Sequence, residues 1–127
     1  MGYTVKEIAE KTGLKPHVLR YYEKEGLLPN VKRTQGGIRQ YTEKDLEWLG
    51  LIRCLKNTGM SIKQIRDFVS LSLRGPETLQ KRCEMLQCHR EDVLANISAM
   101  QEHLETVTHK IAYFTSRLNE YQARKKP

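Results

Sequence analysis

The sequence lacks the features that mark membrane, secreted and catalytic proteins. No run approaches the roughly 18 apolar residues of a membrane span, and a helix starting at Thr4 leaves no room for a signal peptide. The 3 cysteines do not make a disulfide framework, and a reducing compartment would keep them as thiols. No Gly-rich phosphate loop occurs, and no histidine is paired with a carboxylate or a nucleophile. We therefore expect a cytoplasmic protein without membrane contacts, cofactors or enzymatic activity.

The charge of the chain is positive and unevenly distributed. Its 127 residues contain 22 Lys and Arg against 15 Asp and Glu, a formal net charge of +7 at pH 7. Six of these net charges fall in residues 1–74 and only one in residues 75–127. A chain of this length holds one modest core, and a positive balance favours polyanionic partners. A nucleic-acid interface is therefore expected in the first half.

Residues 4–25 are typical of two short helices joined by a tight turn. Thr4 followed by Glu7 forms a capping box for the first helix. Pro16 favours the start of a second helix, which Gly26 ends. Spacings of three and four residues place one set of side chains on the outward face of the second helix. This set is His17, Arg20, Tyr21 and Lys24.

A Gly-tipped hairpin, the wing, is predicted at residues 31–41, followed by two linking helices at residues 42–58 and 61–73. Together these elements predict a mainly α winged helix-turn-helix DNA-binding domain over residues 1–74. Trp48 is expected to anchor the core between the linking helices. Arg20 is the best candidate for reading a base, and His17 could meet a phosphate. The other predicted phosphate contacts are Lys15, Lys24, Lys32, Arg33 and Arg39.

The last part of the chain, residues 77–122, carries a heptad repeat that predicts a coiled coil. Residues 74–76 break the preceding helix, and the chain has no second helix of this length. The partner is therefore expected to be another copy, which makes the protein a homodimer. Residues 123–127 form a basic tail. The predicted dimerisation residues are Leu79, Leu86, Val93, Ile97, Met100, Leu104, Val107, Ile111, Phe114 and Leu118.

The MerR family of bacterial transcription regulators has a signature recognition helix that resembles LRYYEKEGLL at residues 19–28. Its wing and the two helices behind it resemble residues 36–65, and the long last helix completes the match. The resemblance implies that Arg20 and Tyr21 meet the duplex from the helix and Arg39 from the wing. It also implies that Tyr41 supports the hairpin.

The same resemblance implies how the protein works. The two long helices would pair antiparallel, and the dimer would bind double-stranded promoter DNA at an overlong spacer. The activated dimer would kink and untwist the DNA so that RNA polymerase engages both promoter elements. A DNA-binding coiled-coil protein with only an architectural role is the alternative of a different class. It would bind DNA without regard to sequence.

The sequence is compatible with two cysteine-based signals. Cys54 lies within one turn of Arg53 and Lys56, and neighbouring cations favour the reactive thiolate. A MerR subgroup that responds to aldehydes and thiol-reactive electrophiles resembles this chain in carrying a lone cysteine there. The alternative for Cys54 is a small buried core residue. A metal-responsive regulator is a further alternative, with Cys83, Cys88 and His89 as the candidate ligands, although their spacing does not form a compact site.

Overall fold

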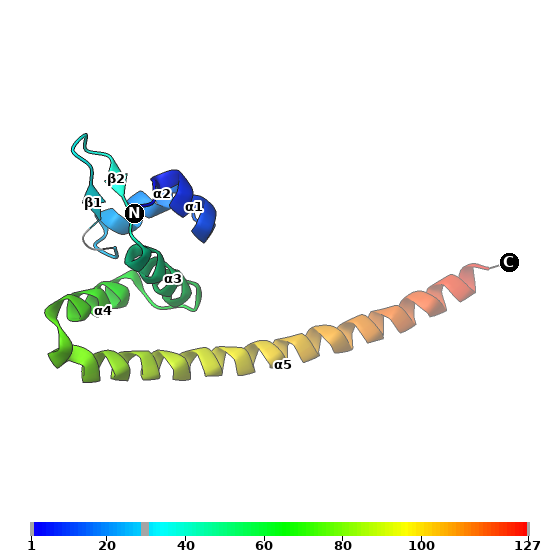
Figure 1. Cartoon of the computed structure of the whole chain (residues 1–127). Helices are drawn as coiled ribbons and strands as arrows, with labels where there is room; N and C mark the ends of the chain where they lie inside the picture. The colour runs from blue at the N-terminus through cyan, green and yellow to red at the C-terminus, as the bar shows by residue number, and fades with distance from the viewer. Residues whose placement is uncertain (1, 29–30, 127) are drawn as a thin grey trace. The chain divides into compact units, whose positions relative to one another are not determined.

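The computed structural model describes residues 2–28 and 31–126, which fold mainly into helices (Figure 1). The elements in chain order are α1 (Val5–Thr12), α2 (Pro16–Lys24), β1 (Lys32–Arg33), β2 (Arg39–Gln40), α3 (Glu43–Asn57), α4 (Ile62–Arg74), a short 3-10 helix η1 (Pro76–Thr78) and α5 (Leu79–Lys125). They form two compact units, Met1–His89 and Arg90–Pro127. The predicted fold class is confirmed. Within the described residues, no helix is long and apolar enough to cross a membrane.

The predicted helix starts are confirmed, because side chains satisfy the free amides at the first turns. Thr4, Thr42 and Ser61 each accept a hydrogen bond from the amide three residues later, and that residue's side chain bonds back. Helix α2 begins differently: Lys15 precedes Pro16 without a side-chain cap bond. Proline suits this position because its fixed φ matches the helix and an amide there has no partner.

The core of the first unit collects buried side chains from α1, α2, α3 and α4. Leu19 of α2 and Leu49 of α3 have no exposed surface. Trp48 is the predicted anchor: its ring stacks on Phe68 of α4 with the centroids 6.1 Å apart. The indole Nε1 of Trp48 also donates a hydrogen bond of 3.0 Å to the carbonyl oxygen of Leu27, just after α2. The anchor therefore joins α3 to α4 and to the segment that follows α2.

The predicted wing is a two-stranded antiparallel hairpin in which Arg33 lies directly opposite Arg39. Gly37 has a φ of 80°, a left-handed conformation that glycine adopts without the steric cost of a Cβ. The base of the hairpin is extended by a bridge between Tyr3 and Tyr41, with hydrogen bonds in both directions. The bridge is not predicted by the sequence, and it ties the N-terminal segment to the wing.

The first unit extends beyond the helix break at residues 74–76 into the first turns of α5. Leu86, one of the predicted dimerisation residues, is partly buried and packs against the core of the same unit. Nε2 of His89 lies 2.6 Å from the Thr58 hydroxyl oxygen at the end of α3. At the other end α5 continues to Lys125, so residues 123–125, predicted as a tail, are helical.

Buried Thr78 closes the junction between α4 and α5. Its hydroxyl oxygen lies 2.6 Å from the carbonyl oxygen of Leu71 and accepts a hydrogen bond of 3.1 Å from Nε of Arg82. A second nitrogen of Arg82 donates to the carbonyl oxygen of Gly75 at 3.1 Å. Because a buried polar group is costly without a partner, these bonds favour a single geometry of the turn.

We predict that Thr78→Val, which keeps the shape and removes the hydroxyl, lowers the free energy of unfolding by about 1–3 kcal/mol. Urea denaturation at a fixed protein concentration measures this change. The matched control is Thr106→Val, because the hydroxyl of Thr106 bonds to the Glu102 carbonyl on an exposed face of α5. Equal effects of the two variants would contradict a special role for the junction.

Candidate nucleic-acid interface

Helix α2 has the two faces that its sequence predicts. Leu19 and Tyr22 are buried in the core. The side chains predicted to face outward are exposed, and Tyr21 keeps 42% of its surface accessible. The exposed set is His17, Arg20, Tyr21 and Lys24. Cations and an aromatic ring therefore share one side of a helix that is 9 residues long.

The wing adds further cations beside α2, and an acidic side chain connects the two elements. Lys32 and Arg33 are exposed, whereas Arg39 is half-buried. Oε2 of Glu23 in α2 lies 2.5 Å from Nε of Arg39, and Oε1 lies 3.5 Å from Nη2 of Arg33. The role of Glu23 is not predicted by the sequence alone. Its position three residues after Arg20 is the sequence feature that points to such a role. A carboxylate at that position would repel DNA unless cations pair with it.

Tyr41 differs from the other predicted interface residues because it is fully buried. It supports the hairpin from beneath, as the resemblance implies, and its ring is not available for direct contact with DNA. Burial raises the pKa of Tyr41; the Glu23 carboxylate raises it further, and the Arg39 guanidinium opposes that effect. Burial also raises the pKa of Tyr22. Both phenols are therefore neutral under the conditions in which DNA would bind.

Two cations of α3 contact the helix-turn-helix, a role that the sequence alone does not predict. The guanidinium of Arg53 donates a hydrogen bond to the carbonyl oxygen of Thr12, at the end of α1. Nζ of Lys56 lies 5.7 Å from the ring centroid of Tyr21 and 5.9 Å from that of Tyr22. These distances are within the range of cation–π attraction. The last turns of α3 therefore contact both α1 and α2.

The cysteines do not form a common site in the described part of the chain. Cys54, Cys83 and Cys88 are all exposed and free. The alternative in which Cys54 is a small buried core residue is therefore wrong for the single chain. No group of three potential ligands that could hold a metal ion occurs among residues 2–28 and 31–126. Nε2 of His89, one of the candidate ligands, lies 2.6 Å from the Thr58 hydroxyl oxygen.

The paired helices, the wing and the cationic face define a winged helix-turn-helix protein of the DNA-binding class. Residues 3–71 match the MerR HTH family of regulatory proteins, and residues 46–110 match the family described as MerR, DNA binding. The chain belongs to the MerR family of transcription regulators and is not an enzyme. The family suggested by the sequence resemblance is thus confirmed.

Individual relatives agree with this assignment. An uncharacterised HTH-type transcriptional regulator of Haemophilus influenzae is 41% identical over 90% of this chain and 84% of its own length. The regulator AdhR of Bacillus subtilis is 37% identical over 71% of this chain and 64% of its own. The crystal structure of HiNmlR, a MerR family regulator lacking the sensor domain and bound to promoter DNA, has a TM-score of 0.86 and 40% identity. That match covers 91% of this chain and 92% of the other.

We predict that Arg20→Ala and Lys24→Ala affect DNA binding differently. Loss of a base contact at Arg20 should cost about 1–3 kcal/mol and relax the preference at one base per half-site. Loss of a phosphate contact at Lys24 should weaken binding to all duplexes alike. It should also reduce the slope of the logarithm of the binding constant against the logarithm of salt concentration by about one. Titrations of selected and mixed-sequence duplexes at several salt concentrations measure both effects. Equal losses on both duplexes for Arg20→Ala would assign Arg20 to a phosphate.

Proposed function

We propose that this chain is a homodimeric regulator that binds promoter DNA with α2 in the major groove and the wing beside it. The observation that carries the proposal is the exposed cationic face of α2 next to the wing. Arg20 would read a base, whereas Lys15, His17, Lys24 and Lys32 would meet phosphates. Competition between a selected duplex and a scrambled one tests the proposal. Equal competition would favour the architectural alternative.

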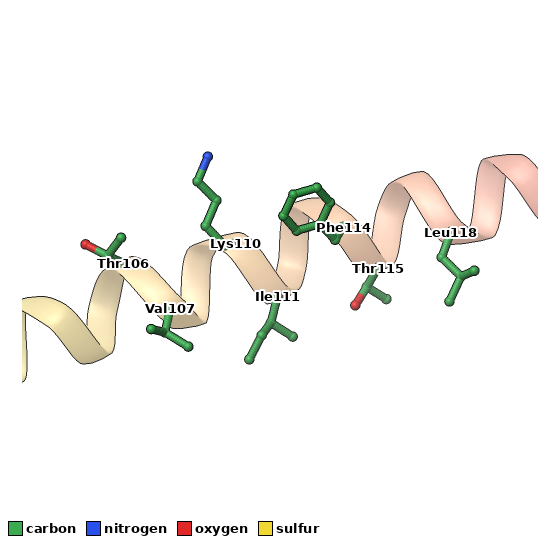
Figure 2. Close-up of a pocket in the computed structure, with 7 residues that line it drawn as sticks. All are labelled: Thr106, Val107, Lys110, Ile111, Phe114, Thr115 and Leu118. Atoms are coloured by element: carbon green, nitrogen blue, oxygen red, sulfur yellow. The ribbon is translucent and has the colours of Figure 1, made fainter.

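The dimer would form through α5, which has no buried residue of its own although it is 47 residues long. Seven apolar seam residues each expose 50–68% of their surface: Ile97, Met100, Leu104, Val107, Ile111, Phe114 and Leu118. Figure 2 shows Val107, Ile111 and Leu118 extending from the same side of the helix, where they help line a shallow apolar hollow. A second copy is the occupant that a heptad seam fits, because the same stripe recurs on the partner.

The two winged helix-turn-helix domains of such a dimer would bind pseudo-palindromic half-sites in successive major grooves. The activated dimer would kink and untwist the promoter spacer so that RNA polymerase engages both of its elements. Because deforming DNA has an energy that depends on its sequence, such a regulator would also select base pairs it does not touch.

Lysine at two seam positions should prevent dimerisation. In Leu104→Lys with Ile111→Lys, like charges would have to be buried along the seam without partners, so the dimer should dissociate at micromolar concentration. Sedimentation velocity measures the assembly state. The matched control is His109→Lys with Ser116→Lys, two lysines with the same heptad spacing on the exposed outer face of α5. A double seam variant that remains dimeric would contradict the coiled coil.

We further propose that the signal is a thiol-reactive electrophile, such as an aldehyde, and that Cys54 senses it. Two observations support the proposal. The thiol is exposed, and its sequence neighbours Arg53 and Lys56 contact α1 and α2. The thiolate would add to the electrophilic carbon. An adduct at Cys54 would add volume beside contacts that position α1 and α2.

We expect Cys54→Ser to leave DNA binding nearly intact and to abolish the response to an aldehyde in a reporter strain. Cys88→Ser is the matched control, because Cys88 is equally a free, exposed thiol but lies on α5. Iodoacetamide labelling of the native dimer, read by mass spectrometry, tests accessibility directly. Labelling of Cys88 but not Cys54 under native conditions, with all three cysteines labelled in urea, would end the sensor proposal.

A further inference from the structure

The Glu23 carboxylate contacts both strands of the wing from the recognition helix. One oxygen lies 2.5 Å from Nε of Arg39 in β2, and the other lies 3.5 Å from Nη2 of Arg33 in β1. Nη1 of Arg33 also donates a hydrogen bond of 3.1 Å to the carbonyl oxygen of Gly37 in the hairpin turn. A continuous set of polar contacts therefore runs from α2 to the turn of the wing.

The wing has a specific need for this carboxylate. Arg33 and Arg39 are opposite one another in the strand register, and like charges at directly opposed positions destabilise an antiparallel pair. Each strand has only two residues, and a two-stranded hairpin is marginally stable in water without further contacts. Within the described residues, no other carboxylate forms an ion pair with either arginine. Glu23 offsets the repulsion and holds the hairpin against α2.

The position of Glu23 also makes its charge unfavourable for DNA binding in itself. It lies on α2 between Arg20 and Lys24, close to the expected path of the phosphates. Removing a negative charge at such a surface increases attraction to any duplex, whatever its sequence. Loss of a positioning contact weakens binding to a selected duplex. A mobile wing loses more conformational entropy on binding than a wing already held at a fixed angle.

From this geometry we propose that Glu23 is a positioning residue for DNA recognition. Its carboxylate sets the angle between the wing and α2 through Arg39 and Arg33. This inference rests on the proposed function in assigning the interface to α2 and the wing. It adds that an acidic residue, which touches no DNA, is needed for the specificity of that interface.

Binding of Glu23→Gln to two duplexes tests the direction of the effect. The first duplex is enriched from a randomised pool by the wild-type protein, and the second is a mixed-sequence duplex of the same length. The variant should bind the enriched duplex about tenfold more weakly, which corresponds to about 1.4 kcal/mol, and bind the mixed duplex as well as or better than the wild type. Tighter binding to both duplexes would overturn the proposal.

Glu25→Gln is the matched control. It makes the same chemical change two residues along the chain, where the Glu25 carboxylate pairs with Arg66 of α4 at 3.5 Å and not with the wing. Removing this charge should tighten binding to both duplexes by a similar small factor. A loss of specificity in the control as large as that in Glu23→Gln would also overturn the proposal, because it would assign the effect to charge or to α2 stability.

Backbone dynamics of the free protein test the positioning role without DNA. Heteronuclear nuclear Overhauser effects at the amides of Gly36 and Gly37 report picosecond to nanosecond motion of the hairpin turn. They should fall in Glu23→Gln and stay at the wild-type value in Glu25→Gln, while the amides of α3 are unchanged in both. Unchanged values at Gly36 and Gly37 in Glu23→Gln would overturn the proposal.

The two measurements separate this inference from the proposed function. If the wild-type protein enriches no sequence from the pool, the proposed function fails, whereas the wing dynamics still decide the role of Glu23. If the wild type enriches a duplex and Glu23→Gln binds it as the wild type does, only the Glu23 inference fails.

Discussion

Burial of Leu19 and Tyr22 in the core is the interaction on which the rest of the DNA-binding unit depends. A helix has only one rotation that buries both side chains, so their burial decides which residues of α2 remain exposed. That rotation places Arg20 in solvent and Glu23 against the wing. The cation of Lys56 then lies over the two tyrosine rings. Apolar packing inside the unit thus fixes the chemistry of its outer surface.

The C-terminal half of α3 and the cap residue that follows it contact three other helices of this unit. Arg53 bonds to the end of α1, Lys56 lies over rings of α2, and Thr58 contacts His89 of α5. Cys54 is exposed within this segment. A chemical change at that thiol would therefore lie close to the contacts that hold the unit together, since its neighbours in sequence contact α1, α2 and the start of α5. This arrangement provides a short physical route between the proposed signal and the proposed interface.

The sequence predicts those parts of the structure whose causes are local. Capping pairs such as Thr4 with Glu7, the proline at position 16 and the heptads of α5 each act within a few turns, and the helix boundaries follow them to within a few residues. The two faces of α2 follow from periodicity alone. Local rules do not predict the Tyr3–Tyr41 bridge or the contacts of Glu23 with the wing, because these join residues that are far apart in the sequence. Leu86 shows the same limit: it fits the heptad, but the core of its own unit lies close enough to take it.

In the proposed homodimer, the exposed stripe of α5 would link assembly to recognition. Side chains such as Met100 and Ile111 expose more than half of their surface, so pairing of two copies would remove apolar area from water and would depend on protein concentration. A duplex that engages two DNA-binding domains at once would favour the dimer over the monomer. By linkage, the dimer would bind the duplex more tightly. The heptad seam and the cationic face of α2 are far apart in the sequence, but in the proposed homodimer the free energies of pairing and of DNA binding would be coupled. A substitution on the seam of that homodimer would therefore alter DNA affinity without touching the interface, and its effect would decline as the protein concentration rises.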